Sequence, residues 1–335
     1  MNRYRLMSFL CVITLTLTAT AADKSLWRGL QFYEENDVFA FKNESDRHYT
    51  QGLRLTTTLN PQRNPNWLND LSNTLCHCSY PFEPVLHVGF GQSIYTPANI
   101  KTAAPQPFDR PWAGWLYGSA ILHLTEVVDP NAVGPTTTRQ QMFEVDLGVV
   151  GQGAGARFAQ TTIHEIIDSP KPLGWHNQIR NQPGINLIYM RNQRHGTRFA
   201  DYTWNVGGDL GNVQTYAAAG VVGRIGYNIS GFTASPMAST ASGPGQRPPF
   251  EAYLFSGVDG RAVLHNIFIR GGSSNIEQKN LVYDGRVGGS MRYRSFRFTY
   301  NYVRRSREFT SPVAFAGTHD FGSFALVWEP ALPVH

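Results

Sequence analysis

Alternation of apolar and polar residues, repeated along most of the chain, constrains the fold more than any other feature of this sequence. In residues 292–303, for example, Phe296 and Phe298 fall on one face of an extended chain, and Arg297 and Thr299 fall on the other. Side chains of a β-strand point alternately to its two faces, so the pattern predicts strands with one apolar face. We expect an all-β fold of about twelve strands. The expected strands are residues 26–40, 50–59, 85–92, 115–125, 143–149, 184–191, 199–210, 213–229, 250–258, 261–270, 292–303 and 321–329.

The composition favours short strands over long helices. The 335 residues include 32 glycines and 20 prolines, which interrupt helices and mark turns. The pair Asp259-Gly260, a common tight-turn sequence, predicts a hairpin between the strands at residues 250–258 and 261–270. Strands of about ten residues with one apolar face are typical of a transmembrane antiparallel β-barrel of the bacterial outer membrane. A soluble periplasmic β-sandwich would give a similar alternation and is the alternative.

The first residues have the pattern of a secretory signal peptide. Arg3 and Arg5 form a basic start, residues 6–17 are mostly apolar, and Ala19-Thr20-Ala21 is a small-residue cleavage sequence. We therefore expect a signal peptide at residues 1–21 and one outer-membrane barrel domain at residues 22–335. Beyond this start, no apolar run is long enough for a membrane-spanning helix.

The net charge of +5 does not indicate a nucleic-acid partner. The basic residues are scattered along the chain, whereas a nucleic-acid footprint requires a clustered basic patch. Scattered basic residues in an outer-membrane protein are better suited to the anionic head groups of outer-membrane lipids. We expect those lipids as partners, no nucleic acid, and a monomeric chain.

Two cysteines, Cys76 and Cys78, remain after the expected signal peptide. Two closely spaced thiols provide too few ligands for a structural zinc site. Exported proteins are exposed to oxidising conditions, so we expect the two cysteines to be paired within a loop.

Polar residues interrupt the alternation near the end of the first strand and at the start of the second. Asn36 and Asp37 follow the apolar alternation of the first strand, and Thr50 begins the second, on the same polar face as Arg54. Neighbouring strands would bring a carboxylate, an amide and a hydroxyl together, which suits a cation or an ester carbonyl. An Asx turn for Asn36 and Asp37, and an ordinary strand role for Thr50, are the alternatives.

Residues 157–168 have helical rather than strand spacing. Gln160, His164 and Asp168 are four residues apart and share one face, and Pro170 follows the end of the segment. His164 is a candidate general base that a neighbouring acid would orient, and an ordinary helix histidine is the alternative. The sequence from His164 also matches the first part of a His-Glu-x-x-His zinc motif, but Asp168 replaces the second histidine.

These segments together resemble the outer-membrane lipid A 3′-O-deacylase family. The matching parts are Glu35-Asn36-Asp37, Asp46-Arg47-His48-Tyr49-Thr50-Gln51-Gly52, Asp109-Arg110-Pro111-Trp112-Ala113-Gly114-Trp115-Leu116-Tyr117, residues 160–164 and Gly174-Trp175-His176-Asn177-Gln178. The resemblance implies a twelve-stranded barrel that uses calcium, with its site between the wall and a helix. The second half of the chain matches only as strand architecture.

By the same resemblance, Asn36, Asp37, Thr50 and His164 take the functional positions. His164 would activate a water, Asp37 would hold the calcium ion, and calcium with Asn36 would stabilise the oxyanion. The family pattern has an acid a few residues after the histidine, where this chain has Pro170. Asp168 is the residue we expect to complete the calcium site, with Glu165 as another candidate.

We therefore expect a calcium-dependent ester hydrolase that removes the 3′-linked acyloxyacyl group from the lipid A of lipopolysaccharide. The expected location is the outer membrane of a Gram-negative cell, as a multi-pass barrel. The alternatives are a non-catalytic or pore-forming barrel that shares the scaffold, and an outer-membrane phospholipase with a serine nucleophile.

Overall fold

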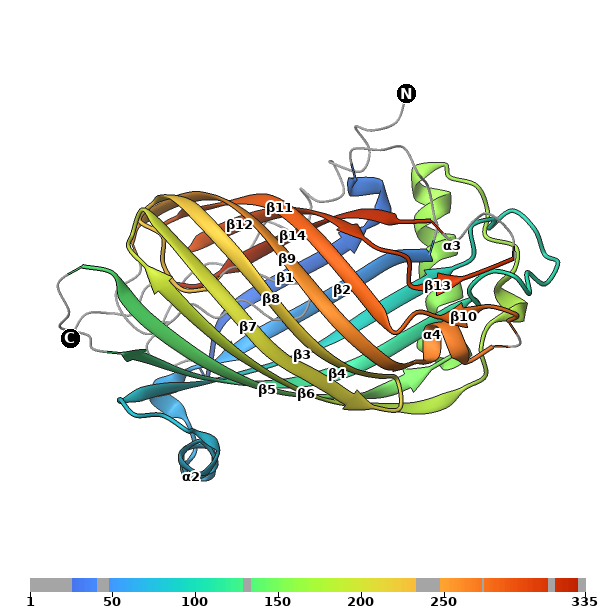
Figure 1. Ribbon diagram of the computed structural model, residues 1–335. Helices are drawn as coiled ribbons and strands as arrows, with labels where there is room; N and C mark the ends of the chain where they lie inside the picture. Colours follow the sequence, from blue (N-terminus) through green and yellow to red (C-terminus); the bar gives the residue numbers. More distant parts are fainter. Residues whose placement is uncertain are drawn as a thin grey trace.

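The computed structural model describes residues 26–40, 48–128, 134–232, 248–272, 274–312 and 317–330. The expected signal peptide, residues 1–21, lies outside these ranges. The described residues form a closed barrel of twelve antiparallel strands (Figure 1). They are β1 (Trp27–Asn36), β2 (His48–Leu59), β3 (Phe82–Thr96), β4 (Ala113–Val128), β5 (Thr136–Val150), β6 (Gln182–Gly196), β7 (Ala200–Gly211), β8 (Gln214–Tyr227), β9 (Phe250–Asn266), β11 (Leu281–Tyr293), β12 (Phe296–Arg305) and β14 (His319–Trp328).

Short helices and one small sheet lie at the two ends of the barrel. The helices are η1 (Asp37–Phe39), η2 (Pro61–Arg63), α2 (Asn66–Leu75), η3 (Gln152–Ala154), α3 (Ala156–Ile167), η4 (Trp175–Asn177) and α4 (Ile267–Arg270). The strands β10 (Glu277–Gln278) and β13 (Phe309–Thr310) pair with each other outside the barrel sheet. Within the described ranges, no helix is both long enough and apolar enough to cross a membrane.

The two ends of the barrel differ in what they carry. At one end lie η1, α3, α4 and the β10–β13 sheet, and we call this the α3 end (Figure 1). At the other end lies α2, where β1 begins and β14 ends, and we call this the α2 end. The expected helix at residues 157–168 is confirmed as α3.

Pairing of the first strand with the last closes the barrel. β1 pairs with β2 on one side and with β14 on the other, and Leu30 lies opposite both Thr57 and Trp328. Because every strand then has two neighbours, the barrel has no open edge whose backbone groups would lack partners in lipid.

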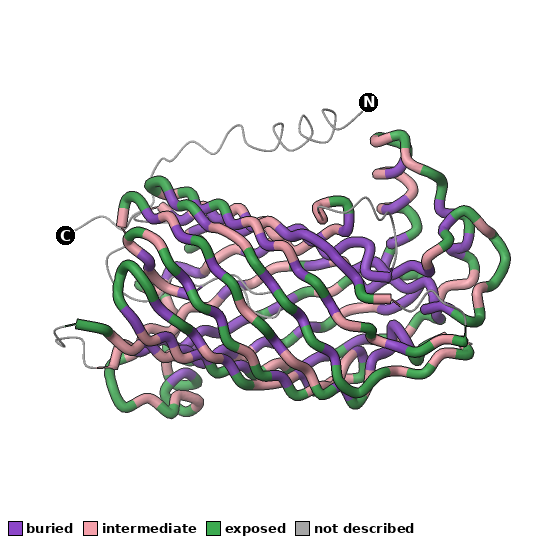
Figure 2. The backbone as a smooth tube through the Cα atoms, turned by 45° about the horizontal axis from the view of Figure 1, so that its top comes forward, coloured by how far each residue is buried: buried purple, intermediate pink, exposed green. Residues whose placement is uncertain are grey.

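The predicted alternation separates the lumen from the outer surface. Along β4, Trp115 and Tyr117 line the lumen, so Leu116 and Leu122 point outward. Exposed and buried residues accordingly alternate along the strands (Figure 2). Large exposed apolar side chains on the outward positions include Leu147, Leu187, Leu254 and Phe298. This outer surface suits lipid.

The predicted hairpin at Asp259-Gly260 is wrong. β9 continues through both residues as one strand, and Asp259 points into the lumen, where its carboxylate pairs with Arg286 at 3.0 Å. The turn sequence was misleading because an inward Asp and a glycine fit a polar lumen as well as a turn. β11, where no separate strand was expected, supplies the missing strand, so the expected number of strands is confirmed.

Ion pairs and aromatic rings fill much of the lumen. Arg54 contacts Glu144 and lies 3.8 Å from Asp146, and both nitrogen–oxygen contacts of Arg305 with Asp284 measure 2.9 Å. A cavity of about 150 Å³ remains among these groups.

Aromatic side chains close the lumen at the α3 end. Phe268 of α4 stacks on Tyr95 with ring centroids 4.0 Å apart, and Trp115 stacks on Tyr117 at 4.1 Å. All four belong to, or pack against, one buried cluster at this end of the lumen.

Candidate active site

Asn36 and Asp37 lie where β1 ends and η1 begins. The Asn36 side chain caps η1, because its Oδ1 accepts a hydrogen bond from the backbone N–H of Val38 at 2.9 Å. The Asp37 side chain is buried, with 1% of its surface exposed. η1 folds against the outer side of β14, where Phe39 packs on Phe324. The Asx-type turn proposed as an alternative is therefore present, and it holds Asp37 at the wall.

Thr50 occupies a β-bulge in β2, and this corrects its predicted orientation. Tyr49 lies opposite Tyr95 and Gln51 lies opposite Ile94, so Thr50 is the extra residue in the ladder. The alternation had placed Thr50 on the face of Arg54, which lines the lumen. A bulge redirects the side chain of the extra residue.

The hydroxyl of Thr50 instead lies on the outer side of the wall. Its Oγ1 is 2.8 Å from Oγ1 of Thr96, and both side chains are buried. Thr96 is two residues after Ile94 on β3, and so shares the face of that residue. Ile94 packs against Ala156 of α3, which lies outside the barrel.

α3 packs directly on the outer face of the wall. Gly114 points outward from β4, and a Cβ atom there would lie 2.4 Å from the Cβ of Ala156. Gln92 of β3 donates a hydrogen bond from Nε2 to the carbonyl oxygen of Ala154 at 2.7 Å. The missing side chain at Gly114 therefore allows the helix to approach the strand backbone closely.

His164 lies on the buried face of α3. Ala156, Gln160 and His164 are the buried residues of the helix, and they recur every four residues. Only 4% of the His164 surface is exposed. With a rise of about 1.5 Å per residue, His164 lies about 12 Å along the axis from Ala156.

A backbone carbonyl fixes the imidazole of His164. Its Nδ1 is 2.6 Å from the carbonyl oxygen of Pro170. A carbonyl oxygen only accepts, so Nδ1 carries the proton and donates it to this bond. In the neutral ring the lone pair is then on Nε2, which is the tautomer a general base requires.

Asp168 does not share the buried face that its spacing predicted. Asp168 is the C-cap of α3, in a left-handed conformation with φ of 57°, and its side chain is exposed. The helix ends one residue earlier than the i+4 pattern requires, so the chain turns away before Asp168 aligns with His164.

The tryptophan loop after α3 clamps the helix to the wall. Trp175 donates a hydrogen bond from Nε1 to Oε1 of Gln160 at 2.8 Å, and its ring packs on Trp112 with centroids 4.9 Å apart. Gly174 permits this arrangement, because a Cβ there would lie 2.6 Å from Nε1 of Trp112. The Gly-Trp motif singled out in the sequence therefore supports the helix that carries His164.

Glu34 is a site residue that the sequence argument did not assign. It alternates with Tyr33 and Glu35, which line the lumen, and therefore points outward. Its buried carboxylate accepts a hydrogen bond from the side chain of Gln51. Carboxylates on the lipid side of a membrane wall are costly and usually mark function. The sequence did contain a signal for this residue. Glu34 continues the alternation of Leu30 and Phe32, so it puts a carboxylate on the otherwise apolar face of the strand.

Strand pairing places Asn36 and Thr50 on one patch of the outer wall, beside the strand on which α3 packs. Asn36 lies opposite Gln51, Gln51 lies opposite Ile94, and Ile94 packs under α3. α3 lies at the end of the barrel at which β1 ends and η1 follows (Figure 1).

The donor atoms of this patch are mainly oxygens. In the described part of the chain, no three His, Cys, Asp or Glu side chains are close enough together to hold a metal ion. The carboxylate of Asp37, the amide oxygen of Asn36 and the hydroxyl of Thr50 are hard ligands of the type that calcium accepts with backbone carbonyls and waters. These oxygen donors do not indicate a site for a soft metal ion, which prefers sulfur ligands.

A closed barrel with an apolar outer surface, a filled lumen and a polar patch beside an external helix defines a protein of the outer membrane. The sequence matches the family model described as outer membrane protein LpxR over residues 6–329. The chain belongs to this family, and it is a multi-pass barrel of the Gram-negative outer membrane. No curated protein sequence matches it.

One solved structure shares the fold of this chain, and a second aligns only weakly. LpxR from Salmonella typhimurium aligns with a TM-score of 0.68 at 19% identity, over 90% of this chain and 99% of that chain. The translocator domain of autotransporter NalP from Neisseria meningitidis aligns with a TM-score of 0.39 at 9% identity, over 97% of this chain and 96% of that chain.

Proposed function

We propose that this chain is a calcium-dependent ester hydrolase that removes the 3′-linked acyloxyacyl group from lipid A. The observation that carries the proposal is the imidazole of His164. It is buried on the face of α3 that packs on the outer wall, and its Nδ1 donates a hydrogen bond to the carbonyl oxygen of Pro170. A base in this position meets a lipid within the membrane plane, without requiring the substrate to enter the lumen.

In this proposal His164 acts as the general base. Nε2 accepts a proton from a water molecule, and the resulting hydroxide attacks the carbonyl carbon of the ester. The ester C–O bond then breaks, and the departing sugar oxygen takes the proton from Nε2, which releases the acyloxyacyl chain as a fatty acid, leaves a hydroxyl on the sugar and restores the neutral imidazole. The Pro170 carbonyl keeps the ring oriented and stabilises its protonated form, so it performs a task for which an acidic side chain is often used.

Calcium is part of the proposal because the oxygen donors fit it. Asp37 would hold the ion, with Asn36 and Thr50 as neighbouring oxygen donors and Glu34 as a further carboxylate on the same face. When bound, calcium would polarise the ester carbonyl as a Lewis acid. Asn36 would donate from its side-chain amide to the oxygen of the carbonyl under attack.

The filled lumen does not favour the pore-forming alternative. The aromatic cluster at the α3 end and the Arg54–Glu144 pair occupy the path that ions would take.

Mass spectrometry of lipid A tests the proposal. Expression of the chain in a Gram-negative host with unmodified lipid A should produce a lighter species that lacks the 3′ acyloxyacyl group. His164→Ala should abolish that species, and His265→Ala, which alters a half-buried histidine of β9, should leave it unchanged. Unmodified lipid A with folded wild-type protein in the outer membrane would refute the proposal.

A further inference from the structure

The segment between β2 and β3 forms a structure of its own on the outer wall at the α2 end. It consists of residues 60–81, which include η2, α2 and the Cys76–Cys78 disulfide, and we call it the collar. It lies at the opposite end of the barrel from α3 (Figure 1). The proposed hydrolase does not use it.

Apolar contacts attach one side of α2 to the lipid-facing surface of the barrel. Leu68 is 1% exposed and packs in one cluster with Leu59, Leu122 and Leu124. Leu122 and Leu124 point outward, because they alternate with the lumen-lining positions of β4. The collar therefore covers wall residues that would otherwise contact lipid.

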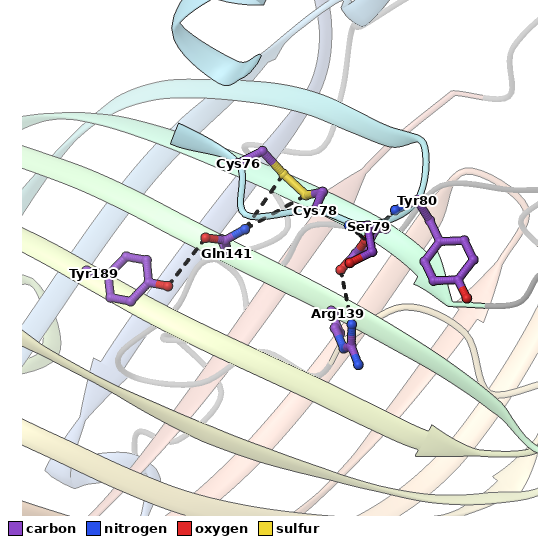
Figure 3. The surroundings of a disulfide bond; sticks show 8 residues. Cys76, Cys78, Ser79, Tyr80, Arg139, Gln141 and Tyr189 are labelled. Carbon is purple, nitrogen blue, oxygen red and sulfur yellow. Dashed lines mark hydrogen bonds and ion pairs between the residues drawn. A yellow bond between two sulfur atoms is a disulfide. The ribbon is translucent and has the colours of Figure 1, made fainter. Parts of the chain in front are cut away.

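Polar contacts fix the disulfide loop to the same surface (Figure 3). The backbone N–H groups of Ser79 and Tyr80 donate to Oε2 of Glu126 at 2.9 and 3.0 Å. Gln141 donates from Nε2 to the sulfur atoms of Cys76 and Cys78 at 3.7 and 3.8 Å. These anchors hold the collar against β4 and β5.

The other side of the collar exposes large apolar side chains. Trp67 is 59% exposed and Leu71 is 42% exposed, one helical turn apart on α2. Tyr80, two residues after the disulfide, is also exposed. An indole and a phenol at the end of a membrane barrel are the side chains that favour the boundary between head groups and acyl chains.

The position and the charge of the collar indicate which surface covers it. The exposed face continues the lipid-facing wall, where Phe90 of β3 is also exposed. Residues 60–81 contain one arginine, Arg63, and one acid, Asp70, so the collar offers no cationic patch for anionic lipid. A zwitterionic phospholipid leaflet fits this surface.

We propose that α2 lies in the phospholipid leaflet at the α2 end, with Trp67 and Leu71 inserted at the head-group boundary. The collar then sets the depth of the barrel in the membrane at that end, and the disulfide loop keeps the helix parallel to the surface.

Fluorescence quenching of Trp67 tests this inference. Full-length wild type and Trp67→Phe are refolded into phosphatidylcholine vesicles, and the difference between their emission spectra isolates Trp67. Lipids brominated near the head group should remove most of this emission, lipids brominated near the chain ends should remove less, and aqueous iodide should have little effect. The matched control is Trp115→Phe, because Trp115 is buried in the lumen and its emission should resist both quenchers.

Two results would overturn the inference. Quenching of Trp67 by iodide but not by brominated lipid would place α2 in water. Protection from both quenchers would show that protein covers the collar, as a second copy of the chain would. A heat-modifiable gel shift identical to that of wild type verifies that each variant is folded.

Discussion

At the scale of single residues, Thr50 links the two strands that form the site. Its hydroxyl is held by Thr96 on the neighbouring strand, on the outer side of the wall. The bulge that turns it outward leaves no trace in an apolar–polar pattern, because one extra residue in a ladder is decided by strand pairing. Sequence therefore identified the residue but assigned it to the wrong face.

Replacing Thr50 separates the role of its hydroxyl from that of its shape. Thr50→Val keeps the volume but removes the hydrogen bond to Thr96, a buried loss of about 1–3 kcal/mol. If that energy acts on the transition state, lipid A turnover should fall about tenfold or more. Thr50→Ser should retain most of the turnover. Wild-type turnover in Thr50→Val would exclude a role for the hydroxyl.

The charge of Glu308 makes barrel stability depend on pH. Burial raises the pKa of this carboxyl, but the guanidinium groups of Arg110 and Arg305 lower it by more, so the pKa lies below its ordinary value of about 4.3. A depressed pKa means that the carboxylate stabilises the folded chain above the ordinary pKa. That stabilisation is lost as the pH falls through the folded-state pKa.

Urea unfolding in detergent at a series of pH values measures this effect. The free energy of unfolding of wild type should fall more steeply below about pH 4 than that of Glu308→Gln, which cannot titrate. Parallel curves for the two proteins would show that Glu308 does not contribute.

At the scale of secondary structure, the site depends on how closely α3 approaches β4. The helix itself was predictable, because its apolar residues recur at helical spacing and Pro170 follows it. Its docking was not predictable from that pattern. It depends on Gly114 and on the Trp112–Trp175 contact, which bring together segments far apart in the sequence.

Filling Gly114 should move the helix away from the wall. The Cβ of Gly114→Ala would meet Ala156 at 2.4 Å, so α3 and His164 must shift. A displacement of about 1 Å can reduce turnover about 100-fold. Gly118→Ala is the matched control, since it lies on the same face of β4 and its Cβ would meet nothing closer than 3.8 Å.

Turnover and folding are measured together for this pair. Gly114→Ala should keep the gel mobility of the folded barrel while losing activity, and Gly118→Ala should keep both. Equal turnover in the two variants would mean that the approach of α3 to the wall does not position the site.

The late strands show where alternation fails as a guide to elements. Residues 250–266 were divided because Asp259-Gly260 has turn chemistry, although the registers with β8 and β11 run continuously through both residues. β11 was hidden because glycines interrupt its alternation at Gly285, Gly288 and Gly289. In both cases cross-strand pairing outweighed local preference.

At the scale of the whole molecule, the barrel is a scaffold that carries η1 and α3 on the outside of its wall. The number of strands and the polar face of most strands could be predicted from periodicity, and the barrel class required the expected signal peptide and the strand count as well. The location of the site outside the wall could not, except through family resemblance. That location arises because η1 and α3 fold back over the outer face of the strands.

The filled lumen predicts that the chain does not conduct ions. Purified wild-type protein in planar bilayers should produce no stable conductance steps, because the residual cavity of about 150 Å³ is bounded by ion pairs and aromatic rings. A porin run in the same bilayers verifies sensitivity. Regular steps from the wild-type chain would support the pore-forming alternative instead.

Lipid A turnover as a function of free calcium tests the central claim, that His164 and Asp37 form one hydrolytic site on the outer wall. Purified wild type should release the 3′ acyloxyacyl group only when calcium is present. Asp37→Asn should require much more calcium, and His164→Asn should stay inactive at every calcium concentration while calcium still raises its unfolding temperature. Wild-type turnover in chelator, or full turnover in His164→Asn, would contradict the claim.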